Sequence, residues 1–407
     1  MKIGIIKEGK TPPDKRTPFA PSHCKQLKGQ YPFLEILVQR SPVRCFSDQE
    51  YADVGAQLVD DVSHCDIIFG VKEVKYDMLA QGKSMLFFSH TIKKQPHNQT
   101  LLQDVLKKHI RLIDYETLTY KNGVRVLGFG RYAGIVGSYN ALMAYGKRYG
   151  TFDLKPAHQC HDMGEMAAEM QKMNLPNIKI IISGGGKVAN GTKETMKAAG
   201  ITEVSIADFL NSQFNRPVYC NADLLDYHEL NGKPPADLQE FINDSTIWKN
   251  TFKKFAQVAD IYISAHFWDN LSALFFTTED VASPEFKVKV IADITCDING
   301  SVPTTIRSTT IEDPVFGYDR ATGTETAPYA PESITIMAVD NLPCEVPKDA
   351  STGFGQDLID RIIPLFLGND PDQILQRGTI AQNGQLTERF QYLQDYVDGK
   401  GHSERNP

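Results

Sequence analysis

A glycine-rich turn between a predicted strand and a predicted helix is the part of this sequence that most clearly indicates chemistry. The apolar run over residues 178–183 leads directly into three consecutive glycines and then a helix start. Gly184 and Gly186 match a GxGxxA turn, which lets the backbone approach a pyrophosphate at a helix N-terminus. We therefore expect four residues of this turn to bind the diphosphate of a dinucleotide: Gly184, Gly186, Lys187 and Val188.

An acidic residue further along the chain indicates which dinucleotide the turn would bind. The sequence predicts a strand over residues 203–207, and Asp208 follows Gly184 at close to the offset of about 20 residues typical of the acid that binds the adenosine ribose. Because a carboxylate repels a 2′-phosphate, Asp208 favours NAD, with NADP as the alternative. A glycine-rich turn with a helix-capping Asp, or a Rossmann-like methyltransferase, would leave a similar pattern. The order of strand, turn, helix and acid favours the dinucleotide site.

Charged side chains follow several apolar runs in the first third of the chain. Ligands of open α/β sheets gather outside the carboxyl ends of the strands, so a cluster of Lys, His and Glu there is where a substrate would bind. Each side chain taken singly is more typical of a solvated surface or a structural histidine. Taken together, they favour a functional site made of Arg16, Lys72, Glu73, His90 and Glu116.

Two other polar segments allow competing interpretations. Asp297 follows a predicted strand over residues 288–294 and could orient a nicotinamide or a base, but its position is equally typical of a turn. His158, Cys160 and His161 suggest a metal, yet no second cluster completes a tetrahedral site, so no metal is predicted. The chain has no GxSxG or HExxH motif, which disfavours hydrolase chemistry.

The elements expected to position these side chains alternate between short apolar strands and amphipathic helices. This alternation predicts an α/β fold of two Rossmann-like domains with parallel sheets. Small and apolar residues at helical spacing over residues 132–149 predict a helix into the second domain, and a helix over residues 332–339 is expected to return the chain. The predicted domains are a discontinuous substrate-binding domain, residues 1–131 and 340–407, and an NAD(P)-binding domain, residues 132–339, with an insertion over residues 211–254.

Composition narrows the partners and the location. The chain has 407 residues, 43 basic and 50 acidic, and its net charge of −7 gives no general attraction to nucleic acid or anionic lipid. Its apolar runs are far shorter than the ~20 residues that span a bilayer, its start does not resemble a secretory signal, and its seven cysteines are scattered. We expect a cytoplasmic protein with small-molecule partners and no nucleic-acid or membrane partner; a homo-oligomer is compatible with the sequence.

Several strings resemble the alanine dehydrogenase and pyridine nucleotide transhydrogenase superfamily, and within it the saccharopine dehydrogenase branch, nearly end to end. The segment 211–254 also resembles that branch. The strings most similar to the lysine–ketoglutarate reductase domain of animal bifunctional enzymes are FFSHTIK (87–93), LIDYE (112–116), GVRV (123–126), FGRYAG (129–134), TTIEDP (309–314) and DNLPCEVPKDAS (340–351). The resemblance implies two Rossmann-like domains with the active site in the cleft between them.

The resemblance also implies roles for residues of the first domain. Lys72 and His90 match an acid–base pair, and Glu73 and Glu116 match the acids that tune it. Arg16 matches a contact to a substrate carboxylate. Carboxylates beside Lys72 would hold its charge, whereas desolvation would lower its pKa, so geometry must decide its protonation state.

Further along the chain, the resemblance implies contacts to the nicotinamide and shows one departure. Asp297 matches an Asp near the nicotinamide, and Asn341 and Leu342 belong to a loop beside that ring. Arg131 stands where relatives carry an aromatic residue or an amide. It either adds a carboxylate contact in the substrate pocket or is a surface arginine at a helix start.

The implied reaction is reversible: L-lysine and 2-oxoglutarate condense to an imine, which hydride from NAD(P)H reduces to saccharopine. Two groups that titrate near neutrality could share the proton transfers at nitrogen and at water. Two alternatives stay open, an alanine dehydrogenase-like amino-acid dehydrogenase and a nucleotide-binding sensor that has lost turnover.

Overall fold

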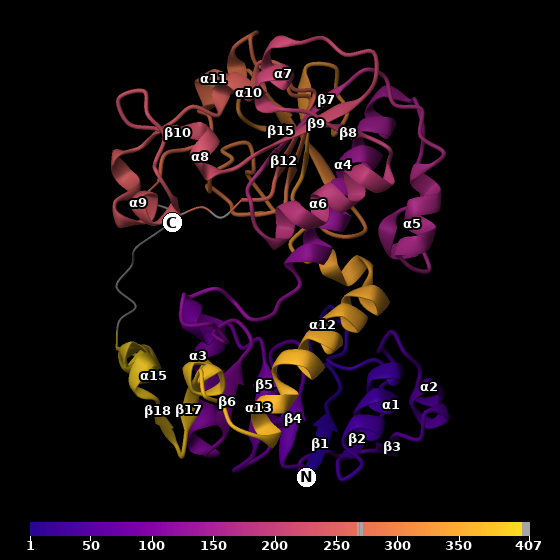
Figure 1. Cartoon of the computed structure of the whole chain (residues 1–407), viewed down its shortest axis with the longest axis vertical. Coiled ribbons are helices and arrows are strands. Elements are labelled where there is room, and N and C mark those ends of the chain that lie inside the picture. The colour runs from indigo at the N-terminus through magenta and orange to yellow at the C-terminus, as the bar shows by residue number, and fades with distance from the viewer. Residues whose placement is uncertain (267, 269–271, 401–407) are drawn as a thin grey trace. The chain divides into compact units, whose positions relative to one another are not determined.

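The chain folds into two compact units, which the computed structural model describes over residues 1–266, 268 and 272–400. Unit 1 contains residues 1–129 and the chain from residue 347 onward, and unit 2 contains residues 130–346 (Figure 1). The units therefore change over after Phe129 and after Val346, whereas the predicted domain boundaries follow residues 131 and 339. The cleft between the domains stays a prediction.

Unit 1 is built on an eight-stranded sheet. Its order is β18-β17-β6-β5-β4-β1-β2-β3, in which β1 to β6 are parallel and β17 and β18 are antiparallel. The sheet order runs in opposite directions on the two sides of the β1–β4 pair, which makes that pair its topological switch point. The strands are β1 (Lys2–Ile5), β2 (Glu35–Gln39), β3 (Gln57–Val59), β4 (Ile67–Phe69), β5 (Ser84–Phe87), β6 (Arg111–Asp114), β17 (Thr379–Gln382) and β18 (Gln385–Leu386).

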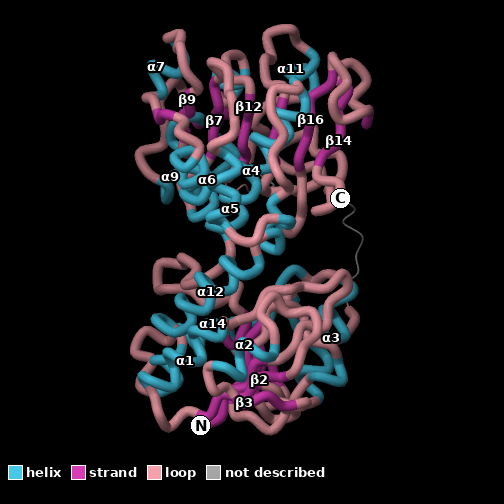
Figure 2. Tube along the Cα trace, turned by 90° about the vertical axis from the view of Figure 1, so that its right-hand side faces the viewer, coloured by secondary structure: helices cyan, strands magenta, loops and turns pink. Residues whose placement is uncertain are grey.

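Helices cover both faces of this sheet, and Figure 2 shows α1 and α3 on opposite sides of the strands. Ile3 and Ile5 point into a core shared with α1 and α12, whereas Leu37 and Ile68 point into a second core with α3. Burial on both faces explains why the strands are almost wholly apolar. The helices of unit 1 are α1 (Pro21–Gln30), α2 (Asp48–Asp53), α3 (Pro96–Lys107), α12 (Pro347–Arg361), α13 (Ile363–Leu367), α14 (Ile374–Gly378) and α15 (Gln394–Val397).

Unit 2 repeats this plan with another eight-stranded sheet. The order is β15-β14-β16-β13-β12-β7-β9-β8. Its last six strands, β16, β13, β12, β7, β9 and β8, are parallel, and β14 and β15 are antiparallel. The predicted fold class, two α/β domains with largely parallel sheets, is confirmed. The strands are β7 (Lys179–Ser183), β8 (Thr202–Glu203), β9 (Val218–Ala222), β12 (Ile261–Ser264), β13 (Val290–Asp293), β14 (Val315–Asp319), β15 (Glu325–Thr326) and β16 (Ser333–Met337).

Close helix packing explains the small residues that the sequence places over residues 132–149. A Cβ atom on Gly134 of α4 would lie 1.9 Å from the carbonyl oxygen of Val188, and one on Gly191 of α6 would lie 2.0 Å from that of Arg131. Only glycine lets the two helices approach so closely. The helices of unit 2 are α4 (Gly130–Tyr149), α5 (Met163–Met170), α6 (Lys187–Ala198), α7 (Ile206–Asn211), α8 (Leu224–Tyr227), α9 (Leu238–Asn243), α10 (Lys253–Ala256) and α11 (Thr278–Ala282).

Two expectations about unit 2 are wrong. The predicted helix over residues 332–339 contains β16, which pairs with β13 and β14 and is buried along its length, because its β-branched apolar run fits the interior of a sheet. The predicted insertion over residues 211–254 contains β9, which pairs with β7. What lies outside the main sheet is a smaller segment with the antiparallel pair β10 (His228–Glu229) and β11 (Lys249–Asn250).

Candidate active site

The switch point of unit 1 joins two residues that follow neighbouring strands. Glu8 follows β1, and its carboxylate accepts hydrogen bonds from the backbone N–H groups of Val71 and Lys72, at 2.7 and 2.8 Å. Lys72 follows β4. Sequence reasoning missed Glu8, although a carboxylate directly after the first strand is the signal that could have found it.

Charge and burial shift the pKa values of both groups. Burial, reinforced by the nearby charge of Asp14, raises the pKa of Glu8 to about 8. Burial also lowers the pKa of the Lys72 amine, and the cations Arg16 and Lys10 lower it further, although Glu73 and Asp14 oppose them. Both shifts move these groups toward exchange of a proton near neutral pH.

Arg16 is buried and already ion-paired. Its guanidinium donates two hydrogen bonds to Asp14, at 3.1 and 2.6 Å, and lies over the ring of Phe129, 4.3 Å from the centroid. Burial opposes ionisation of Asp14, but Arg16 outweighs it and lowers the pKa of that carboxyl to about 2. Arg16 therefore stands beside Lys72 with much of its charge balanced by a carboxylate.

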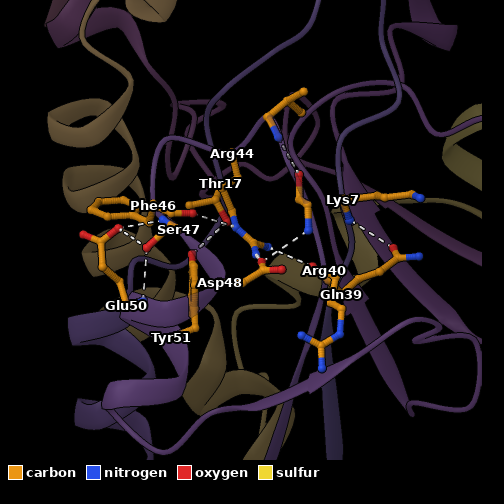
Figure 3. Close-up of polar contacts among 12 residues, drawn as sticks. Lys7, Thr17, Gln39, Arg40, Arg44, Phe46, Ser47, Asp48, Glu50 and Tyr51 are labelled. Carbon is orange, nitrogen blue, oxygen red and sulfur yellow. Dashed lines mark hydrogen bonds and ion pairs between the residues drawn. The ribbon is translucent and has the colours of Figure 1, made fainter.

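The loop that carries Arg16 is held in place by contacts with Tyr51. The Tyr51 hydroxyl donates a hydrogen bond to the carbonyl oxygen of Phe19 at 2.5 Å and lies 3.4 Å from the hydroxyl of Thr17 (Figure 3). Arg44 lies over the Tyr51 ring and forms an ion pair with Asp48 at 2.8 Å. These contacts fix the backbone on which Arg16 stands.

His90 and Glu73 form a coupled pair. The imidazole Nδ1 of His90 is hydrogen-bonded to Glu73 Oε1, and its ring stacks on Phe88 at 6.3 Å between centroids. Burial opposes ionisation of Glu73, but the bond to His90 and the charge of Lys10, 3.7 Å away, lower its pKa to about 2. The structure thus brings His90 against the ionised neighbour of Lys72.

Glu116 lies at the carboxyl end of β6 and pairs with a different partner. Its Oε1 accepts a hydrogen bond from Arg125 at 2.9 Å. Among the described residues, Glu73 Oε2 and Glu116 Oε2 are buried and have no hydrogen-bond partner. Buried polar atoms are nearly always hydrogen-bonded, so these two oxygens point to a ligand with N–H or O–H donors.

The glycine turn of unit 2 has the backbone that a diphosphate requires. Gly184 has φ +114, and a Cβ atom there would lie 2.5 Å from the carbonyl oxygen of Ala265, so only glycine fits. Gly186 precedes α6, and a Cβ atom on it would meet no other atom within 4 Å. Lys187 and Val188 open α6, and the first N–H groups of a helix are the groups that commonly bind the diphosphate of a dinucleotide.

The acid that reaches this turn is Asp223, and the expected placement of Asp208 at a strand end is wrong. Asp208 lies in the first turn of α7, where its N–H donates to the Ser205 hydroxyl at 3.1 Å. The reason is strand order: β8 is an edge strand and β9 lies next to β7, so Asp223, directly after β9, stands where a ribose-binding acid is needed. A Cβ atom on Gly185 would lie 2.2 Å from Asp223 Oδ2.

The remaining expected cofactor contacts lie in loops of unit 2. Strand β13 ends at Asp293, which is buried, and the exposed Asp297 occupies a turn in which its carbonyl accepts the N–H of Gly300 at 3.0 Å. Asn341 precedes a short 3₁₀ helix that begins at the buried Leu342. Both lie in unit 2, although the predicted boundary assigned them to the first domain.

Arg131 fits the second of its two interpretations. Its guanidinium forms two hydrogen bonds with Glu194 of α6, at 2.8 and 2.6 Å, and both side chains are about half exposed. The structure places it on the surface of unit 2, in the contact between α4 and α6. A contact to a substrate carboxylate would need this ion pair to open.

The histidine-rich segment makes pairwise contacts only. His158 lies 3.8 Å from Glu345, and His161 lies 2.9 Å from Asp162. Over the described ranges, no group of three or more His, Cys, Asp or Glu side chains is arranged to hold a metal ion. Within those same ranges, no helix combines the length and the apolar character needed to cross a membrane. The cytoplasmic location stays a prediction.

The chain thus consists of two α/β units, one with a glycine turn at the start of a helix and the other with a charged cluster after its strands. The family model of the alanine dehydrogenase/PNT N-terminal domain matches residues 4–136. A solved L-alanine dehydrogenase shares the fold with a TM-score of 0.64 and 16% identity, over 98% of this chain and 99% of that one.

Two relatives make the similarity more specific. The chain is 26% identical over 441 residues to alpha-aminoadipic semialdehyde synthase of Arabidopsis thaliana, covering 96% of this chain and 41% of that protein. It is 24% identical over 374 residues to saccharopine dehydrogenase (NAD+, L-lysine-forming) of Emericella nidulans, covering 89% and 92%. The resemblance seen in the motifs is confirmed. The chain spans less than half the length of the Arabidopsis relative.

Proposed function

We propose that this chain is a nicotinamide-dinucleotide-dependent oxidoreductase of the saccharopine dehydrogenase type, which interconverts saccharopine with L-lysine and 2-oxoglutarate. The observation that carries the proposal is the coupled Glu73–His90 pair beside Lys72, at the carboxyl ends of β4 and β5. The similarity to saccharopine dehydrogenase of Emericella nidulans along most of both chains supports it. The proposal concerns the reaction of this segment alone, not the whole activity of longer relatives.

Unit 2 offers the residues that would hold the dinucleotide. Gly184, Gly186 and the N-terminus of α6 at Lys187 and Val188 suit the diphosphate, and Asp223 suits ribose hydroxyls. When bound, the nicotinamide group donates or accepts the hydride. Because Asp223 would repel a 2′-phosphate, we propose NAD as the preferred form. Asp297, Asn341 and Leu342 are proposed to act at its nicotinamide end.

Unit 1 offers the groups that move protons. His90, oriented by Glu73, can give or take a proton at the substrate nitrogen or at the attacking water. Lys72, whose pKa burial lowers, can take the second role. Burial raises the pKa of Glu8 to about 8, and Glu8 lies beside the Lys72 backbone, so it holds a proton at neutral pH that it can give up and take back.

The same cluster suits an amino-acid substrate that carries both charges. Within the described residues the buried Oε2 atoms of Glu73 and Glu116 accept no hydrogen bond, so they can accept one from a substrate ammonium group, although Lys10 lies 3.7 Å from that oxygen of Glu73. Lys10, Lys72 and Arg16 supply positive charge for substrate carboxylates, with Arg16 held in place by Asp14. A dicarboxylate partner would thus meet cations in a protein whose net charge is −7.

Turnover with two substrate mixtures tests the proposal. Oxidation of NADH and of NADPH is followed with L-lysine plus 2-oxoglutarate, and separately with pyruvate plus ammonia. We expect turnover in the first mixture with a preference for NADH. Turnover only in the second mixture would instead support an alanine dehydrogenase-like enzyme, which has the same fold as the solved L-alanine dehydrogenase. Dinucleotide binding with no turnover in either would indicate a sensor.

A further inference from the structure

The backbone of His90 adopts a conformation that is uncommon for residues other than glycine. His90 has φ 52 and ψ 14, in the left-handed region, and it separates β5 from the short helix that begins at Thr91. Non-glycine residues adopt this conformation in only a few per cent of cases, and at a functional site the surroundings commonly hold it. Something in unit 1 must therefore hold the two residues that flank His90.

A buried carboxylate holds both flanks. Asp114, at the end of β6, accepts hydrogen bonds from the backbone N–H of Ser89, at 2.9 Å, and from the Ser89 hydroxyl. The hydroxyls of Ser89 and Thr91 lie 2.8 Å apart, so the contact extends to the residue after His90. Asp114, Ser89 and Thr91 are all fully buried.

The neighbours of Asp114 require it to remain an acceptor. Its other carboxylate oxygen accepts the backbone N–H of Glu116 at 2.7 Å. Three groups donate to it, two from Ser89 and one from Glu116, and the two oxygens of a carboxyl group can accept all three. An amide in its place would turn an NH₂ group toward at least one of these donors.

We propose that Asp114 is a positioning residue for the acid–base chemistry: through Ser89 and Thr91 it holds His90 in the left-handed conformation that directs the imidazole to Glu73. This inference rests on the proposed function for His90, but the geometry it explains does not. The carboxylate, the two hydroxyls and the histidine come from the carboxyl ends of neighbouring parallel strands β5 and β6, which keeps them in fixed register. A displaced imidazole would be expected to lower the rate strongly, since a misplacement of about 1 Å can cost about 100-fold.

The test replaces members of this network and follows His90 directly. Ser89→Ala removes one hydroxyl, Thr91→Val removes the other at almost constant shape, and Asp114→Asn introduces the NH₂ group. Thr117→Val is the matched control, because Thr117 is also buried and its hydroxyl donates to the carbonyl oxygens of Asp114 and Gly378, not to the carboxylate.

The first measurement is the ring ¹⁵N–¹H NMR spectrum of the histidines across a pH series, with His90 assigned from its loss in His90→Gln. We expect the His90 resonances to move in Ser89→Ala and Asp114→Asn and to stay unchanged in Thr117→Val. Unchanged His90 resonances in both would overturn the inference, whatever the activity. Should Asp114→Asn fail to fold, Ser89→Ala and Thr91→Val carry the test.

The second measurement separates this inference from the proposed function. In the lysine and 2-oxoglutarate assay, we expect Ser89→Ala to lower kcat by about 10- to 100-fold and to shift the pH profile of kcat/KM, with KM for NADH unchanged. Moved His90 resonances in a chain with no turnover would leave the positioning intact and reject the proposed function. Turnover with unchanged His90 resonances in every variant would support the proposed function and reject the positioning role of Asp114.

Discussion

The two units share one scaffold and differ in what stands at the carboxyl edge of each sheet. Both sheets have six parallel strands with two antiparallel strands added at one side. The ionisable residues Glu8 and Lys72 lie at the switch point of unit 1. At the corresponding point of unit 2, between β7 and β12, stand Gly184 and the backbone of Ala265. The comparison shows that the chemistry depends on the residues after the strands, since both units place six parallel strands around one switch point. The strand order beyond that point differs, with β1-β2-β3 in unit 1 and β7-β9-β8 in unit 2.

The difference is also one of charge. Behind the glycine turn of unit 2, burial lowers the pKa of His266 to about 3, and the ring bridges the hydroxyls of Ser183 and Ser301 at 2.7 and 2.8 Å. The groups directly behind the turn are therefore neutral, which suits a diphosphate, and the carboxylate beside Gly185 comes from Asp223. The edge of unit 1 holds carboxylates and cations whose pKa values are moved in both directions, which suits proton transfer.

The largest expected effect comes from removing the proton-transfer groups of unit 1. We expect Lys72→Met and His90→Gln each to lower kcat by about 10²- to 10⁴-fold, the usual contribution of general acid–base catalysis. Dinucleotide affinity, measured by fluorescence titration, should change by less than about twofold because the turn that binds it lies in unit 2. Equal losses in rate and in dinucleotide affinity would show that proton transfer and dinucleotide binding are not assigned to separate units.

The second-largest expected effect is a difference in stability between substitutions at two glycines of the unit 2 turn. Gly184→Ala places a Cβ atom against Ala265 at a positive φ, so we expect a loss of about 1–3 kcal/mol in the free energy of unfolding. Gly186→Ala meets open space and should leave stability within about 0.5 kcal/mol while weakening dinucleotide binding. Thermal unfolding and affinity of both variants are measured together; equal stability losses would contradict the assignment.

Cofactor choice distinguishes the two acids near this turn. We expect Asp223→Ala to shift the NADH-to-NADPH preference by about tenfold or more, since hydrogen bonds to a charged group contribute about 1.5–3 kcal/mol. Asp208→Ala is the matched control, because Asp208 lies in the first turn of α7, next to its N-cap Ser205, and should leave the preference unchanged. The ratio of kcat/KM values with the two cofactors is the measurement, and a shift in the Asp208 variant alone would restore the first interpretation.

The smallest effect is a change in how stability depends on pH. The pKa of Glu8 rises on folding from 4.5 to about 8, so the folded protein keeps a proton that the unfolded chain has lost, and stability should fall as pH rises between these values. Glu8→Gln removes the titration and should flatten the decline of Tm over that window.

Glu50→Gln provides a control of opposite sign. Hydrogen bonds from Ser47, at the start of α2 (Figure 3), lower the pKa of Glu50. Its contribution is therefore present above its ordinary pKa and lost as pH falls through the lowered value. A steeper pH dependence in Glu8→Gln than in the parent chain would show that the sign assigned to Glu8 is wrong.

Local patterns were sufficient to predict much of this protein. The strands that precede Lys72, His90 and Gly184 are short apolar runs. A parallel strand buried on both faces has this pattern at any place in the sheet. The glycine turn could be predicted equally well, because the backbone conformation at Gly184 excludes other residues. These features depend on neighbours along the chain, so the order of residues was enough.

Contacts between distant segments decided the rest. That Asp223 rather than Asp208 reaches the glycine turn depends on β9 lying between β7 and β8, and nothing local to either residue encodes that order. The left-handed His90 depends on Asp114, and the surface position of Arg131 depends on Glu194 in another helix. Strand order and side-chain partners result from the packing of whole elements, in which residues far apart in sequence compete for the same neighbours, so they exist only in the folded molecule.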